Sequence, residues 1–176
     1  FGAHREAQMK RGRLIHSLLQ YLPELPRDLR EAAGRDFLKR DVELDDAQRA
    51  DMLGAAMGVL SDPAMAEVFA PGGRAEAAVI GTAGELPKGT VINGRVDRLV
   101  VTPDRVLVID FKTDQPAPDT VSGVADTYLA QMGAYWAVLR QAYKGREVVA
   151  ALCWTDGPKL MVLPEDNLLA ALKGAQ

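Results

Sequence analysis

The stretch GRVDRLVVTPDRVLVIDFK, residues 94–112, contains two valine-rich runs on either side of a Thr-Pro-Asp turn. Such runs are typical of β-strands, and a tight turn at residues 102–104 makes them antiparallel neighbours. One run nevertheless carries Asp97, and the other ends in Asp110 and Lys112. Alternate side chains of a strand share a face, so Asp110 and Lys112 point away from the core. This hairpin allows Asp97 to approach Asp110, but the sequence does not fix the register.

Two carboxylates held close together repel each other unless a cation joins them. Oxygen ligands of this kind are preferred by Mg²⁺, which can activate water and stabilise charge on a phosphate. Lys112 can point at that phosphate or at a metal-bound water. The acidic hairpin therefore favours a Mg²⁺ site that cleaves a phosphodiester. From these residues alone, an exposed salt-bridge surface is an equal alternative, with Asp97 and Asp110 pairing with Arg95, Arg98 and Lys112.

Composition sets the broad class of the protein. The chain has 176 residues, of which 48% are apolar and 26% charged, with a net charge of −3. This suits one globular domain, and no apolar run approaches the ~18 residues of a membrane-spanning helix, so we expect no membrane association. The single cysteine, Cys153, excludes an internal disulfide and a four-cysteine iron–sulfur or zinc site in this chain. We expect a cytoplasmic setting, and the missing initiator Met suggests an excised piece of a longer protein.

The order of predicted elements indicates the fold. Helix and strand signals occur in this order: helices at 4–22, 27–40, 45–61 and 63–69, strands at 75–80, 90–101 and 105–112, a helix at 125–143, strands at 147–154 and 159–163, and a helix from Pro164. We expect a mixed sheet flanked by helices, an α/β or α+β fold. The whole chain, 1–176, is expected to form one domain, with a helical part at 1–70, a sheet core with the active site at 74–163 and a C-terminal helix at 164–176.

Three further groups of residues are chemical candidates. His16 lies in an apolar helical pattern, where a histidine is more often structural than a ligand. Gln131 and Tyr135 are four apart and share a helix face, which suits hydrogen bonding to DNA but equally an ordinary half-buried face. Arg11 and Arg13 belong to a basic run that can contact phosphates or simply face solvent. None of these groups decides a function by itself.

Four blocks change this balance when they are taken together. They are RGRLIHSLL at 11–19, GRVDRL at 94–99, VIDFKT at 108–113 and YLAQMGAYWAVL at 128–139. In this order they resemble the RecB-type nuclease domain of the PD-(D/E)XK superfamily, and more narrowly the C-terminal nuclease domain of the AddA helicase–nuclease subunit. The resemblance implies a restriction-endonuclease-like fold. It also implies a Mg²⁺-dependent DNA exonuclease, in which Mn²⁺ can substitute, that processes double-strand break ends for recombinational repair.

The resemblance assigns roles to matching positions of this sequence. It implies that Asp97 and Asp110 are metal ligands and that Lys112 is the catalytic lysine. His16 and the backbone carbonyl of Phe111 are implied as further ligands of the metal. Its remaining assignments are Gln131 and Tyr135 as residues that line the site and contact DNA, and Glu76 as the acid of the first strand of the family's sheet.

The chain lacks the G-x-x-x-x-G-K-[ST] motif that cradles the phosphates of ATP. The resemblance therefore places ATP, the helicase motor that feeds single strands and an AddB-like partner subunit outside this chain. One alternative is a stand-alone RecB-like nuclease, although those often carry cysteine clusters. Another is a catalytically silent domain of the same fold that binds DNA or a partner. The intact set of Asp97, Asp110 and Lys112 argues against silence.

Overall fold

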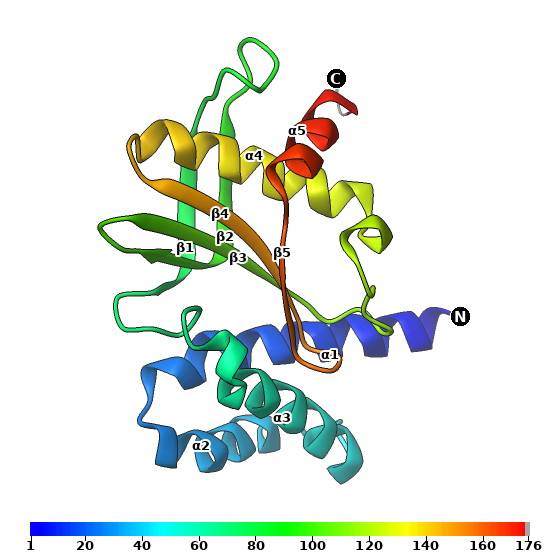
Figure 1. Ribbon diagram of the computed structural model, residues 1–176. Helices are drawn as coiled ribbons and strands as arrows, with labels where there is room; N and C mark the ends of the chain where they lie inside the picture. The colour runs from blue at the N-terminus through cyan, green and yellow to red at the C-terminus, as the bar shows by residue number, and fades with distance from the viewer. Residues whose placement is uncertain (175–176) are drawn as a thin grey trace. The chain divides into compact units, whose positions relative to one another are not determined.

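The computed structural model describes residues 1–174 and divides the chain into two compact units (Figure 1). One unit comprises Phe1–Phe69, Phe111–Ala117 and Trp154–Lys159. The other comprises Ala70–Asp110, Pro118–Cys153 and the chain from Leu160 onward. The division falls within a strand, because Asp110 and Phe111 are consecutive residues of β3.

The first unit is mainly helical. It contains α1 (Gly2–Tyr21), α2 (Arg27–Lys39) and α3 (Asp46–Ser61), with short 3₁₀ turns η1 (Leu22–Glu24) and η2 (Pro63–Met65). Asp45 begins α3 with a capping box, in which its side chain accepts from Gln48 N at 2.7 Å and Gln48 Oε1 accepts from Asp45 N at 2.9 Å. The three long helices agree with the expected ones. The helix expected at 63–69 is instead the single turn η2, capped by the Asp62 side chain.

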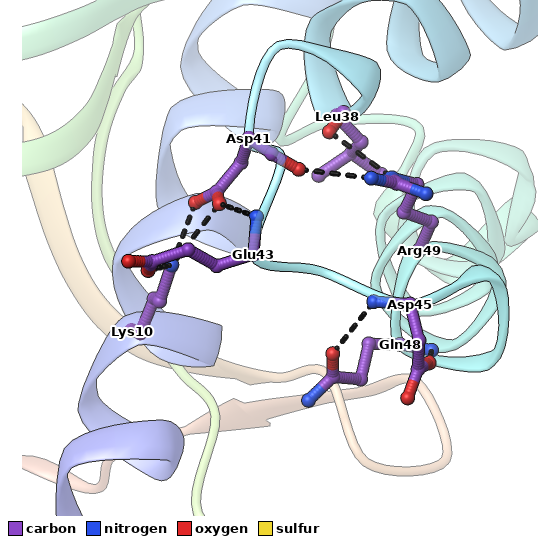
Figure 2. A network of polar contacts seen from close by, with 7 residues as sticks. All are labelled: Lys10, Leu38, Asp41, Glu43, Asp45, Gln48 and Arg49. Atoms are coloured by element: carbon purple, nitrogen blue, oxygen red, sulfur yellow. Dashed lines mark hydrogen bonds and ion pairs between the residues drawn. The ribbon is translucent and has the colours of Figure 1, made fainter.

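Ion pairs and hydrogen bonds of charged side chains link α1 and α3 to the segment between α2 and α3, residues 40–45 (Figure 2). Lys10 Nζ contacts Asp41 Oδ2 at 2.9 Å and also the carboxylate of Glu43. Arg49 donates to the carbonyl oxygens of Asp41 and Leu38 at 2.9 and 3.4 Å. Hydrogen bonds to Glu43 and Asp41 raise the pKa of Lys10, while the bond from Lys10 lowers the pKa of Asp41.

A five-stranded sheet contains β1 (Arg74–Gly81), β2 (Ile92–Val101), β3 (Arg105–Lys112), β4 (Glu147–Trp154) and β5 (Lys159–Val162), in that spatial order. β2 is antiparallel to both β1 and β3. β4 runs parallel to β3, since Glu147 N bonds Asp104 O at 3.1 Å at one end and Thr155 N bonds Lys112 O at 3.0 Å at the other. The sheet is therefore mixed, and the expected α+β class is confirmed.

Two helices complete the second unit. α4 (Asp126–Ala142) connects β3 to β4 and lies across the sheet, and α5 (Glu165–Gly174) packs beside α4 (Figure 1). Trp136 Nε1 donates to the carbonyl of Val148 at 3.1 Å, which ties α4 to β4. The buried core of this unit includes Val96, Leu107, Ile109, Met132, Trp136, Leu152 and Leu168.

The expected C-terminal helix at 164–176 is observed as far as Gly174, and residues 175–176 lie outside the described part. Within residues 1–174, none of the helices combines the length and apolar character needed to cross a membrane.

Candidate active site

The register of the β2–β3 hairpin brings two acidic residues together. Arg98 pairs with Ile109 and Leu99 with Val108, so the next step of the same register sets Asp97 opposite Asp110. The backbone N–H of Asp97 donates to Oδ1 of Asp110 at 3.1 Å. Asp110 is 6% exposed and Asp97 is half-buried. A largely buried carboxylate is thus fixed by the backbone of the strand that carries the second one.

Glu76 lies in the same row of the sheet. On β1, Ala75 pairs with Arg98 and Ala77 with Val96, which sets the intervening Glu76 at the position facing Asp97. Glu76 has φ +50°, the only positive value among non-glycine residues of the described chain. Such a conformation costs about 1–3 kcal/mol and persists where surrounding structure enforces it, often at functional sites. The register thereby places one acid on each of three neighbouring strands.

Lys112 follows Asp110 by two residues on β3 and is half-buried. Alternation along the strand gives the two side chains the same direction. The carbonyl of Lys112 accepts the hydrogen bond from Thr155 N, so the end of β3 is held by the chain that leaves β4.

His16 and Phe111 meet within the helical unit. His16 Nε2 lies 2.9 Å from the carbonyl oxygen of Phe111, and Nδ1 lies 2.9 Å from that of Gly12. The Phe111 ring stacks on Phe69 at 6.1 Å and meets the His16 ring edge-on at 6.2 Å. A Cβ at Gly12 would lie 2.9 Å from Thr113 Oγ1, so a glycine lets α1 approach the chain that follows β3.

The groups around His16 suit a metal ion. Both carbonyl oxygens are acceptors, and a neutral imidazole carries a single N–H, so it can satisfy only one of them. A metal ion held by Nε2 and the Phe111 carbonyl would leave Nδ1–H donating to Gly12 O. Metal-bound histidines are usually oriented by such a second hydrogen bond. The arrangement within this unit therefore fits the ligand roles implied for His16 and Phe111.

The carboxylate pair also fits a divalent cation. Mg²⁺ is usually bound by one or two carboxylates together with waters and substrate phosphates. Asp97 and Asp110 supply that number of carboxylates. Among residues 1–174, no three or more His, Cys, Asp or Glu side chains gather into a group that could hold a metal.

Of the two residues Gln131 and Tyr135, the first lies on the surface and the second in the core. Tyr135 is 7% exposed and packs against Gly94 of β2, where a Cβ would lie 2.4 Å from its hydroxyl oxygen. Residues 94 and 97 differ by an odd number, so Tyr135 covers the face of β2 opposite to that of Asp97. Gln131 is exposed. The structure gives Tyr135 a packing role, and DNA contact by either residue stays a prediction.

The two arginines of α1 also differ. Arg11 forms a two-point ion pair with Asp51 of α3, with Nε–Oδ2 at 2.6 Å and Nη2–Oδ1 at 3.3 Å. Arg13 is exposed. Arg11 thus joins two helices of its unit, and contact of either arginine with DNA stays a prediction.

Arg95 was considered from the sequence only as a salt-bridge partner of the two acids. It is exposed on β2, two residues before Asp97, and its side chain forms no hydrogen bond or ion pair with any residue from 1 to 174. The salt-bridge alternative therefore does not hold for this arginine. Alternation in GRVDRL already indicated that Arg95 shares the face of Asp97, but not whether a partner was present.

The chain can now be compared with known proteins. A profile of the PD-(D/E)XK nuclease superfamily matches residues 2–166. No curated protein matches significantly. A crystal structure of the protein SSO0001 aligns with 90% of this chain and 71% of its own, at 14% identity and a TM-score of 0.34, a likeness too weak to support an argument. Because the profile match spans almost the whole sequence and includes the acidic hairpin, the chain belongs to the PD-(D/E)XK nuclease superfamily, as the four blocks predicted.

Proposed function

We propose that this chain is a Mg²⁺-dependent nuclease domain that hydrolyses phosphodiester bonds of DNA. The observation that carries this proposal is the Asp97–Asp110 pair, set opposite each other by the strand register and joined by the 3.1 Å bond from Asp97 N to Asp110 Oδ1. Membership of a superfamily whose members are generally nucleases with divalent metal ions supports it. A cation bound between two neighbouring acids would offset the repulsion of their carboxylates.

Each residue of the proposed centre has a distinct task. Asp97 and Asp110 would hold the cation, which when bound offsets phosphate charge and lowers the pKa of a bound water. The hydrogen bond to Asp110 orients its carboxylate before any ligand arrives. Lys112 would bind the phosphate or orient the attacking water. The family resemblance adds His16 and the carbonyl of Phe111, the residue after Asp110, as further ligands.

We further propose that the domain belongs to an AddAB/RecBCD-type helicase–nuclease and acts as an exonuclease on double-strand break ends. Support comes from the order of the four sequence blocks across residues 11–139. The helicase motor, its ATP and an AddB-like partner subunit would lie outside these 176 residues. In that setting the motor would supply single strands to the acidic hairpin. A stand-alone RecB-like nuclease remains the alternative, and activity of the isolated chain on free DNA ends would favour it.

The first experiment is a calorimetric titration of Mn²⁺ and Mg²⁺ into the chain and Asp97→Ala, with cleavage of a labelled single-stranded oligonucleotide measured in parallel. We expect binding that Asp97→Ala weakens at least about tenfold, because half of the carboxylate pair is lost. Asp110→Asn should reduce cleavage to background without unfolding the domain. Asp104→Asn, which removes an equal charge from the exposed turn of the same hairpin, should change neither.

A substitution of Lys112 distinguishes metal binding from turnover in the same assays. Lys112→Met should keep metal affinity and lower turnover at least about 100-fold, the usual contribution of a positioned acid or base. A wild-type chain that binds metal but leaves both single strands and DNA ends intact would favour the catalytically silent alternative. Full cleavage by Asp110→Asn would refute the assignment of the acidic hairpin.

A further inference from the structure

The face of β2 that carries Asp97 continues as an open surface. Asn93 and Arg95 precede Asp97 at alternate positions and therefore share its face. Across the ladder on β1, Ala78 pairs with Arg95 and Ile80 pairs with Asn93. All four of these residues are exposed, and Ile80 is 66% exposed. A surface of one cation, one amide and apolar side chains thus leads up to the acidic pair.

Packing on the opposite face of β2 fixes the orientation of this surface. Gly94 lies under Tyr135 of α4, with the hydroxyl oxygen 2.4 Å from where a Cβ would be, and Val96 is fully buried. β2 is also hydrogen-bonded on both sides, to β1 and to β3. Arg95 therefore cannot turn toward the core without breaking strand pairing. Its Cα lies about 7 Å along the strand from that of Asp97.

Arg95 has no partner within the described part of the chain. On the side of Arg95 away from Asp97, its neighbours on this face, Asn93, Ala78 and Ile80, are neutral, and Ala78 directly opposite is too short to cover it. A guanidinium in this position can bind phosphate oxygens with two parallel hydrogen bonds. The exposed apolar side chain of Ile80 can contact sugars or bases beside that phosphate.

We propose that Arg95 is a substrate-positioning residue that binds a backbone phosphate of single-stranded DNA next to the bond that is cut. The strand then follows β2 from Asp97 toward Asn93, with Ile80 beside it. This inference rests on the proposed nuclease function and adds the course of the substrate and the residue that holds it. The phosphate contact fixes the register of the strand relative to Asp97 but reads no sequence.

The test compares Arg95→Gln, Arg95→Lys and the control Lys144→Gln, which removes an equal charge from an exposed site after α4. Binding is measured by fluorescence anisotropy of a labelled single-stranded oligonucleotide in EDTA over a salt series, and kcat and KM are measured with Mg²⁺. We expect Arg95→Gln to raise both Kd and KM about tenfold, as for a lost charge-assisted hydrogen bond. Its slope of log K against log salt should fall by about 0.7.

The remaining variants identify the interaction. Arg95→Lys should recover the salt slope and part of the affinity, because the charge returns without the two-point geometry. Lys144→Gln should match the wild type, and thermal melts should show all three variants folded.

The outcomes separate this inference from the function on which it rests. A cleaving wild type with unchanged Kd, KM and salt slope in Arg95→Gln would overturn the Arg95 contact and leave the nuclease intact. DNA binding that depends on Arg95, without cleavage under any metal, would support the contact and overturn the proposed function. A wild type that neither binds nor cuts DNA would overturn both.

Discussion

Arg11 and Arg95 both stand next to a glycine in a sequence block of the nuclease family, but their surroundings are opposite. Arg11 forms a two-point ion pair with Asp51, at 2.6 and 3.3 Å, and its side chain is 13% exposed. Arg95 is exposed and has no partner among residues 1–174. In the helical unit, positive charge holds helices to one another. On the open face of β2 it is left facing solvent beside a pair of acids.

Lys10 repeats the pattern of Arg11. It contacts Asp41 at 2.9 Å and also Glu43, and so joins α1 to the α2–α3 connection (Figure 2). A basic run in a sequence is therefore a poor guide to DNA contact, because its members can be committed to carboxylates inside the fold. Arg95, whose exposed side chain has no partner among residues 1–174, is the better candidate.

The largest effect on stability should come from a substitution on the face of β2 that Tyr135 covers. Gly94→Ala would place a methyl group 2.4 Å from the Tyr135 hydroxyl oxygen, and this overpacking should lower the free energy of unfolding by about 1–3 kcal/mol. The double variant with Tyr135→Phe, which removes that oxygen, should recover part of the loss. Urea unfolding checks both. Gly84→Ala, where nothing lies within 4 Å, should be harmless. An equal loss at both glycines would argue against the contact.

A second prediction tests the difference between the two arginines directly. Arg11→Gln should lower the free energy of unfolding by about 1 kcal/mol, the upper range for a well-aligned surface ion pair, and leave DNA affinity unchanged. Arg95→Gln should do the reverse. Chemical denaturation and anisotropy on the same samples provide the comparison. If Arg11→Gln weakens DNA binding as much as Arg95→Gln does, the contrast fails and the basic run of α1 contacts DNA after all.

Replacing Glu76 by glycine should change the free energy of unfolding only slightly, and the change can be stabilising. Glycine adopts φ +50° without steric strain, so Glu76→Gly should leave the free energy of unfolding within about 0.5 kcal/mol of the wild type or raise it. Ala78→Gly, at a regular position of the same strand, should cost about 1 kcal/mol. If Glu76 is the acid of the first strand, Glu76→Gly should also lose cleavage. Unimpaired cleavage would assign the strained backbone to folding alone.

The smallest effect should be a pH dependence of the Lys10–Asp41 contact. The hydrogen bond from Lys10 lowers the pKa of Asp41 below its ordinary 3.8, so the folded state binds that proton less readily than the unfolded state. The resulting stabilisation is present above pH 3.8 and is lost as the pH falls through the lowered pKa. Asp41→Asn should therefore be slightly less stable than the wild type at pH 6, and the difference should shrink as the pH falls below 3.8. A constant difference in melting temperature across this range would contradict the contact.

Much of the framework could be predicted from local sequence. Alternation and the Thr-Pro-Asp turn indicated the hairpin, and the order of elements indicated the mixed sheet. The register of Asp97 against Asp110 could not be predicted, since several turn geometries are compatible with the same residues. The partner of Arg11 also escaped prediction, because Asp51 lies 40 residues away and only helix packing brings them together.

The backbone of Glu76 gave no sequence signal at all, because positive φ is expected at glycine or asparagine. Tyr135 shows a different limit. Its spacing from Gln131 correctly indicated a shared helix face, but not that Gly94 would leave room for the ring on the hidden side of β2. Local pattern thus located the candidate residues, while long-range packing decided which of them share the face of the sheet that carries Asp97.

The hydrogen bond from Asp97 N to Asp110 Oδ1 also provides a spectroscopic probe of ligand binding at Asp110. This amide proton is donated to a side-chain carboxylate, so its ¹⁵N–¹H resonance depends on the electron density of that carboxylate. Any ligand that draws on Asp110 should shift that resonance, even when no bond is cut. Solution NMR of Asp97 could thereby follow occupancy of the acidic hairpin without labelled substrate and without turnover.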